Sequence, residues 1–178
     1  MNKKTFFIVF SLLSISAFII GCSQDNSGNN TAMVTPALLL PADEEISGWV
    51  NFGSYEEANN FDSLYEIIDG VAQVYIDNGF VSGVFQQYIS SVGGSTVTLR
   101  IYDQGNEANA SITFDKVGIG IPWNGVGREA RINETTLASY IIEFWQRNFF
   151  IQIAIDQKTD EALDIAKLFA SHISRNIG

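Results

Sequence analysis

Cysteine and histidine are almost absent from this chain of 178 residues, in which Cys22 and His172 are the only ones. A single cysteine cannot form an internal disulfide, so the stability of the folded chain has to come from packing. A zinc site built from cysteine and histidine would lack its further ligands. We therefore expect His172, near the C-terminus, to be solvated or to lie beside a helix dipole.

Positive charge is also scarce, because 10 Lys and Arg residues stand against 20 Asp and Glu residues, giving a net charge of −10. Such a surface repels nucleic acid phosphates and anionic lipid headgroups. The composition therefore argues against a nucleic-acid partner and against membrane attachment through a basic patch.

Familiar catalytic and cofactor motifs are missing as well. The sequence contains no GxSxG, HExxH or SxxK pattern and no calcium-binding loop. Gly118-Ile119-Gly120 is not followed by the Gly-Lys-Ser/Thr of a phosphate loop, and a helix rather than a strand is expected before it. The sequence therefore predicts neither a cofactor nor a metal ion.

The chain begins with the features of a secretion signal. Lys3 and Lys4 precede an apolar run at residues 6–20, and the run ends in Ile19-Ile20-Gly21-Cys22, which resembles the bacterial lipobox. An uncleaved anchor is the alternative, but a membrane-spanning helix needs about 20 apolar residues. We therefore expect residues 1–21 to be a lipoprotein signal peptide and Cys22 to receive the lipid.

Cleavage before Cys22 would leave 157 residues with a net charge of −12. This length suits one domain with a substantial core. Residues 22–37 then form the lipidated cysteine and a polar tether, and residues 38–178 form a single domain. Acyl chains on Cys22 would attach the protein to a membrane, on its periplasmic or extracellular face. Ser23 in place of Asp favours the outer membrane, as resemblance to other lipoproteins implies.

The hydrophobic pattern predicts an α+β fold, an antiparallel sheet of at least four strands in two hairpins, packed by about three helices. The expected elements are a short edge strand near residues 48–52, a helix over 61–76, strands 84–92 and 95–103 joined by Gly93-Gly94, a helix over 107–117, an irregular glycine-rich loop over 118–136, strands 137–145 and 149–155, and a helix after Thr159.

The two longest predicted helices have definite apolar stripes. We expect the first helix to bury Phe61, Leu64, Tyr65, Ile68, Ala72, Tyr75 and Ile76, and the last helix to bury Ala162, Ala166, Phe169, Ile173 and Ile177. Gly70 lies inside the first helix, where glycine costs about 1 kcal/mol relative to alanine. Its presence suggests close packing or a close approach of the backbone at that position.

Three short motifs occur in order along the chain, namely Leu39-Leu40-Pro41, Gly48-Trp49 and, over residues 64–80, LYxxI[ND]GxAxxY[LI]xxGF. With this pattern the chain resembles an uncharacterised family of bacterial secreted proteins and lipoproteins of unknown function. The resemblance covers about residues 39–145 and implies no activity. This chain differs from the family at Asp69, where Asn is usual, and at Gln73, where Glu is usual.

The first candidate site is a polar group on the predicted helix 61–76. Glu66 and Asp69 are three residues apart, and Gln73 follows four residues later. Two carboxylates can divide acid and base roles if their environments separate their pKa values. The alternative is a solvated helix face.

The second candidate site is the glycine-rich loop over residues 118–136. Trp123 offers a face for stacking, and Arg128 and Arg131 supply paired positive charge. Together these side chains could hold a planar or anionic ligand. The alternative is a surface loop whose tryptophan packs into the core.

The third candidate is the polar side of the first hairpin, where we place Gln86, Gln87, Arg100 and Tyr102. This side could bind a ligand or partner, or be an ordinary hydrated sheet face.

Taken together, these features favour a non-catalytic, lipid-anchored domain of the cell envelope that binds a partner protein or a small ligand. The alternative is an envelope hydrolase that uses a carboxylate, Asp69 or Glu66.

Overall fold

The computed structural model of this protein describes residues 34–178, so the predicted signal peptide, Cys22 and most of the predicted tether lie outside the described residues. The elements are η1 (Pro36–Leu39), β1 (Trp49–Asn51), β2 (Glu56–Ala58), α1 (Phe61–Ile68), η2 (Asp69–Val71), α2 (Ala72–Asp77), β3 (Ser82–Ser90), β4 (Thr96–Asp103), α3 (Glu107–Val117), β5 (Ile121–Pro122), β6 (Glu129–Asn133), β7 (Tyr140–Gln146), β8 (Phe149–Ile155) and α4 (Asp160–Ile177). Pro36 is already buried, so the fold begins slightly before the predicted boundary at residue 38.

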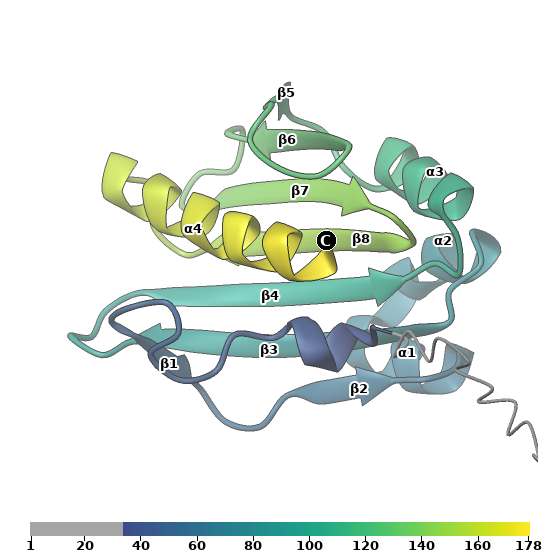
Figure 1. Ribbon diagram of the computed structural model, residues 1–178, viewed down its shortest axis with the longest axis horizontal. Helices are drawn as coiled ribbons and strands as arrows, with labels where there is room; N and C mark the ends of the chain where they lie inside the picture. The colour runs from purple at the N-terminus through teal and green to yellow at the C-terminus, as the bar shows by residue number, and fades with distance from the viewer. Residues whose placement is uncertain (1–33) are drawn as a thin grey trace, which may run out of the picture. The chain divides into compact units, whose positions relative to one another are not determined.

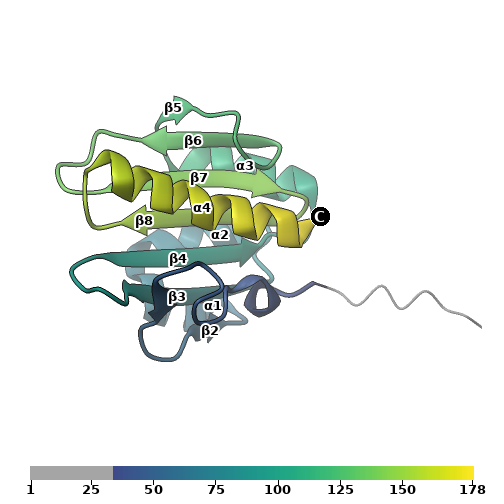
Figure 2. The same cartoon turned by 60° about the vertical axis from the view of Figure 1, so that its left-hand side comes forward.

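The strands form one antiparallel sheet, which confirms the predicted α+β class. Seven of the eight strands follow the order β1-β3-β4-β8-β7-β6-β5, and the eighth, β2, pairs with β3 outside this order. Helix α4 lies on one face of the sheet, and helices α1, α2 and α3 lie on the other (Figures 1 and 2). The central strands β8 and β4 are therefore covered by helices on both sides over part of their length.

Both predicted hairpins are confirmed, with differences at their ends. β3 pairs with β4 and β7 pairs with β8. The predicted two-residue link at Gly93-Gly94 is longer in the structure, because β3 ends at Ser90 and β4 starts at Thr96. Both glycines do adopt positive φ angles, of 88° and 94°. The predicted edge strand is present as β1.

The larger core lies between the sheet and α4. Thr159 begins this helix as predicted, and its side chain accepts a hydrogen bond from the backbone N–H of Ala162. The predicted stripe of α4 is buried in full. It packs on an apolar face of the strands that includes Val84, Val97, Leu99, Ile101, Ile142, Phe144, Ile151, Ile153 and Ile155.

A second core lies on the opposite face, where α1, α2 and α3 cover one end of the sheet. It consists mainly of aromatic side chains from both layers, namely Leu64, Ala72, Tyr75, Phe85, Tyr102, Ala110, Phe114, Trp145 and Phe150. Helix α3 has the predicted bounds, and the side chain of Asn106 caps its first turn. This second core positions the helices that border the candidate site.

The predicted continuous helix over residues 61–76 is wrong. The helix breaks at Asp69, whose φ and ψ angles are 54° and −144°, and resumes as α2 at Ala72. The predicted stripe is also only partly buried, because Leu64 lies in the core whereas Phe61 and Tyr65 are 40% and 47% exposed. Gly70 is not tightly packed either, since a methyl group there would meet open space. An Asp-Gly pair favours turns, and this local preference outweighs the apolar stripe.

Two further expectations are corrected. The segment over residues 118–136 is not an irregular loop, because it contains β5 and β6 at the edge of the sheet. His172 is not solvated but 8% exposed, with its Nε2 2.8 Å from the amide of Asn176 and 3.6 Å from Oε1 of Glu45. Both differences arise from tertiary packing, which local sequence patterns do not report.

Among residues 34–178, no helix is both long enough and apolar enough to cross a membrane.

Candidate functional site

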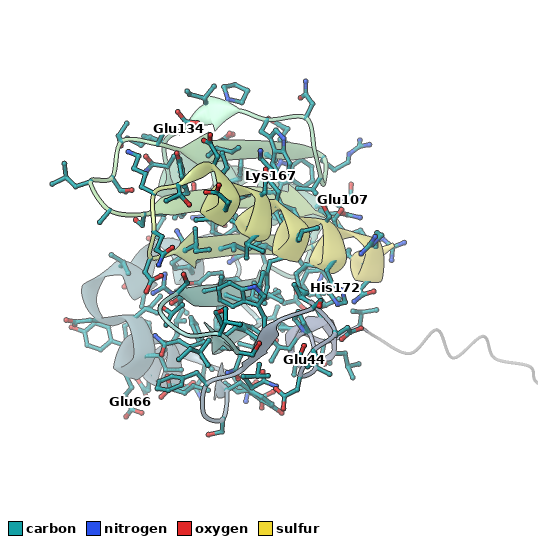
Figure 3. All side chains as sticks on the ribbon, turned by 90° about the vertical axis from the view of Figure 1, so that its left-hand side faces the viewer. Glu44, Glu66, Glu107, Glu134, Lys167 and His172 are labelled. Carbon is teal, nitrogen blue, oxygen red and sulfur yellow. The ribbon has the colours of Figure 1, made fainter. Side chains whose placement is uncertain are left out.

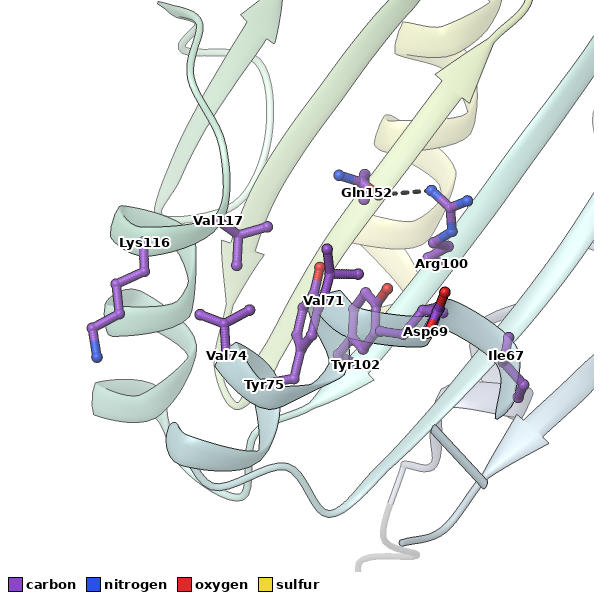
Figure 4. A pocket seen from close by; sticks show the side chains of 11 residues that line it. Ile67, Asp69, Val71, Val74, Tyr75, Arg100, Tyr102, Lys116, Val117 and Gln152 are labelled. Atoms are coloured by element: carbon purple, nitrogen blue, oxygen red, sulfur yellow. Dashed lines mark hydrogen bonds between the residues drawn. The ribbon is translucent and has the colours of Figure 1, made fainter. Parts of the chain in front are cut away.

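A cleft of about 550 Å³ opens on the face of the sheet opposite α4, between the helices of the second core and strands β4 and β8 (Figure 4). Its lining residues are Ile67, Ile68, Asp69, Val71, Val74, Tyr75, Arg100, Tyr102, Lys116, Val117 and Gln152. A smaller hollow of about 370 Å³ shares Ile67, Ile68 and Arg100 with it. The volume falls in the range typical of small-molecule sites, about 300–1,000 Å³.

Strand alternation places Arg100 and Tyr102 in this cleft. Along β4, Leu99 and Ile101 point to the α4 core, so the residues between and after them point to the opposite face. Tyr102 lies under the helix layer and is 1% exposed, whereas Arg100 lies beyond the helices and is only partly buried. The edge of the helix layer therefore determines where the cleft opens.

A row of polar side chains crosses four neighbouring strands below the cleft. Arg100 pairs in register with Gln152, Gln152 with Glu143, and Glu143 with Arg131. Nη1 of Arg100 donates to Oε1 of Gln152 over 2.9 Å, and Nε2 of Gln152 donates to Oε1 of Glu143 over 2.7 Å. Nε of Arg131 donates to Oε2 of Glu143 over 2.7 Å. These four residues are called the polar row below.

The two ends of the polar row differ. At one end Arg131 is 9% exposed, donates from Nη2 to the backbone oxygen of Phe114 over 2.7 Å, and lies 4.0 Å from the centre of the Phe114 ring. At the other end Arg100 has Gln152 as its hydrogen-bond partner, and no carboxylate of residues 34–178 lies within 4.0 Å of its guanidinium. The polar row therefore ends at the cleft in a cation with unused donors.

Two stacked tyrosines form the inner wall of the cleft. The rings of Tyr75 and Tyr102 are 4.1 Å apart and nearly parallel. Burial raises the pKa of Tyr75 to about 12, and the neighbouring Tyr102 hydroxyl partly offsets this rise. Burial likewise raises the pKa of Tyr102 well above its usual value. Both hydroxyls are therefore neutral at physiological pH and available only for hydrogen bonding.

Asp69 is the one residue of the first predicted site that lines the cleft. Its φ of 54° and ψ of −144° belong to a region that residues other than glycine rarely adopt, at a cost of about 1–3 kcal/mol. Glu66 is exposed and points away from the fold on the outer side of α1 (Figure 3). Gln73 donates to Asp77 over 2.6 Å and does not line the cleft, but it lines a neighbouring hollow that shares Val71, Val74 and Lys116 with the cleft. The helix break thus separates the three residues.

The residues of the second predicted site lie at the other edge of the sheet. Trp123 and Arg128 line one hollow of about 420 Å³, and Arg128 and Arg131 line another of about 300 Å³. Trp123 is half-buried against the α4 core. Because Arg131 belongs to β6 and is paired with Glu143, it does not supply the free positive charge that the loop hypothesis required.

Arg100 and Tyr102 of the third predicted site do line the cleft, whereas Gln86 is misplaced by the prediction. Gln86 pairs with Leu99 and is buried, since adjacent strand residues point to opposite faces. Sequence reasoning missed Gln152 and Glu143 altogether. The available signal was an isolated polar residue in the middle of each apolar strand, which must find a partner when it is buried.

No protein-family model matches this chain, and no curated protein or solved structure was found to be similar to it. The resemblance described from residues 39–145 therefore stays a prediction.

Proposed function

We propose that this α+β domain is a non-catalytic binding module that takes a small molecule into the cleft, and that lipid on Cys22 attaches it to the cell envelope. The single observation that best supports binding is Arg100, a partly buried cation at the cleft that donates to the uncharged Gln152 and has no carboxylate of residues 34–178 within 4.0 Å. Small-molecule sites typically combine apolar walls with a few placed polar or charged groups that orient the ligand, and Arg100 is such a group in this cleft.

The shape of the site favours a small ligand over a protein partner. Protein interfaces generally use broad surfaces of about 800 Å² on each partner. Here the polar residues and the apolar residues converge on one hollow between a helix layer and a sheet. For the hydrolase alternative, which uses Asp69 or Glu66, Glu66 lies outside the cleft, so Asp69 is the carboxylate that the cleft offers.

Binding in the cleft can be tested with N-phenyl-1-naphthylamine, an uncharged dye that fluoresces in apolar surroundings. Val71 borders the cleft and is 61% exposed, so Val71→Trp adds bulk at the mouth with little effect on folding. We expect this variant to weaken dye binding about tenfold, a loss of about 1.4 kcal/mol. Val92→Trp is the matched control, because Val92 is 93% exposed at the tip of the β3–β4 hairpin.

The proposal predicts dye binding that Val71→Trp weakens and Val92→Trp leaves unchanged, with equal melting temperatures for all three proteins. Dye that fails to bind, or that binds equally to both variants, would overturn the cleft as the binding site.

The anchoring part of the proposal is tested separately in the full-length protein. Cys22→Ser should leave an unprocessed precursor without lipid mass, because the lipobox cysteine is the acceptor. Ser23→Ala is the neighbouring control and should still be processed. Intact mass and detergent partitioning measure the outcome. A Cys22→Ser protein that keeps both the lipid mass and the detergent partitioning would refute the assignment.

A further inference from the structure

We infer that the ligand of the cleft is an amphipathic organic anion, with one negatively charged head held by Arg100 and an apolar body held by the helix layer. This inference rests on the proposed function, since it names the class of ligand for the same site. Its basis is the direction of the hydrogen bonds, the balance of charge and the chemistry of the walls.

The hydrogen bonds of the polar row run in a fixed direction. The carboxylate of Glu143 accepts from both Arg131 and Gln152, so the amide of Gln152 is oriented with its oxygen toward Arg100. That oxygen accepts one hydrogen bond from Arg100. The guanidinium has further N–H donors and no acceptor. A ligand at Arg100 must therefore present acceptors, and a carboxylate or sulfonate presents them with the matching charge.

The charges of the polar row leave an excess at the cleft. The carboxylate of Glu143 is neutralised by Arg131 through a direct ion pair, while Gln152 is uncharged. Arg100 is thus not balanced within the polar row. The other cation at the cleft, Lys116, donates from Nζ to Oδ1 of Asn78 over 3.0 Å, and this uncharged partner leaves its positive charge in place. The lining therefore carries two cations, Arg100 and Lys116, against the single carboxylate of Asp69, and Arg100 is the one that continues the polar row.

The rest of the wall is largely apolar. Ile67, Ile68, Val71, Val74 and Val117 supply aliphatic surface from α1, η2, α2 and α3. In Figure 4 the side chains of Val71, Val74 and Val117 lie beside the tyrosine pair, while Arg100 and Gln152 lie beyond it. Burying an apolar body here contributes about 25 cal/mol per Å² of surface removed from water.

Asp69 limits the charge of the head. It is a carboxylate lining the same cleft as Arg100, so a second negative charge on the ligand would meet a like charge. A head with one negative charge satisfies Arg100 without this repulsion. The structure therefore fits a monocarboxylate or a comparable monoanion better than a dianion.

The test compares two dyes that share one ring system, the uncharged N-phenyl-1-naphthylamine and the anionic 8-anilinonaphthalene-1-sulfonate. We expect the wild-type protein to bind the sulfonate about tenfold more tightly than the neutral dye. Arg100→Gln should bind the two dyes about equally, with its affinity for the neutral dye unchanged from the wild-type protein. Arg128→Gln is the matched control, because Arg128 is an exposed arginine outside the cleft. Asp69→Asn should strengthen binding of the sulfonate.

Decanoate and decyltrimethylammonium extend the test to simple chains of opposite charge. Decanoate should displace the bound sulfonate dye from the wild-type protein but not from Arg100→Gln, and decyltrimethylammonium should displace it from neither. If Arg100→Gln keeps the preference for the anion, or if the cation competes as well as decanoate, the inferred ligand class is wrong. In that case the proposed function still stands if Val71→Trp weakens binding of the neutral dye. If Val71→Trp does not weaken it, both the ligand class and the proposed function are overturned.

Discussion

Arg131 and Glu143 form the ion pair that holds the polar row together, and removing one partner should destabilise the whole domain. Nε of Arg131 lies 2.7 Å from Oε2 of Glu143, and the two side chains are only 10% and 4% exposed, respectively. Arg131→Met keeps most of the side-chain length over the Phe114 ring but leaves the Glu143 carboxylate buried without its cation. Breaking a buried pair in this way costs about 3–5 kcal/mol.

Urea unfolding followed by tryptophan fluorescence measures this loss directly. The expected drop is a large part of the free energy of unfolding of a domain this size, which is about 5–15 kcal/mol. It corresponds to a fall in melting temperature of about 10 °C. Arg128→Met, at an exposed arginine on the same edge of the sheet, should change the free energy of unfolding by less than about 0.5 kcal/mol.

A double variant separates the cost of an unpaired charge from the value of the pair. Arg131→Met with Glu143→Leu removes both charges, so the pair of substitutions should cost much less than the sum of the single ones. If Arg131→Met alone costs less than about 1 kcal/mol, or if the double variant equals that sum, then the reasoning about the polar row is refuted.

Two further predictions concern residues next to the same site. Gly118→Ala should cost about 1–3 kcal/mol in urea unfolding, because a methyl group there would overlap the Glu143 carboxylate and lie 2.6 Å from Nη2 of Arg131. Gly70→Ala, in open space, is its control, and equal losses for the two variants would contradict the packing. Burial raises the pKa of Tyr75 from 10.0 to about 12, so the folded state favours the neutral phenol and loses stability as the pH rises from 10 to 12. Between pH 10 and 12 the free energy of unfolding of Tyr75→Phe should therefore fall by about 2–3 kcal/mol less than that of the wild-type protein. Parallel curves of unfolding free energy against pH for the two proteins would argue against a raised pKa of Tyr75.

Much of the fold could be predicted because its signals are local. Asn106 and Thr159 begin α3 and α4, and each is followed by a regular apolar stripe, so both helices start where the sequence predicts. The break at Asp69 was missed because a stripe at helical spacing continues on both sides of it. Periodicity reports which residues could share a face, but it does not report the backbone angles that decide whether they do.

The site could be predicted only in part, because it depends on which strands are neighbours. Arg100 and Tyr102 were placed on the polar face of the first hairpin by simple alternation. Their partner Gln152 comes from β8, about fifty residues later, and reaches Arg100 only because β4 pairs with β8. Such long-range pairing is not encoded in any single stretch of the chain, so the polar row could not be assembled from the sequence alone.

The most direct test of the cleft as the binding site is a backbone NMR titration of the ¹⁵N-labelled domain with decanoate. The account predicts that the amides of residues 67–75, Arg100 and Gln152 shift together and saturate, while those of residues 123–128 at the far edge stay in place. The same titration of Arg100→Gln should show much smaller shifts. Shifts confined to residues 123–128, or equal shifts in the two proteins, would contradict the account.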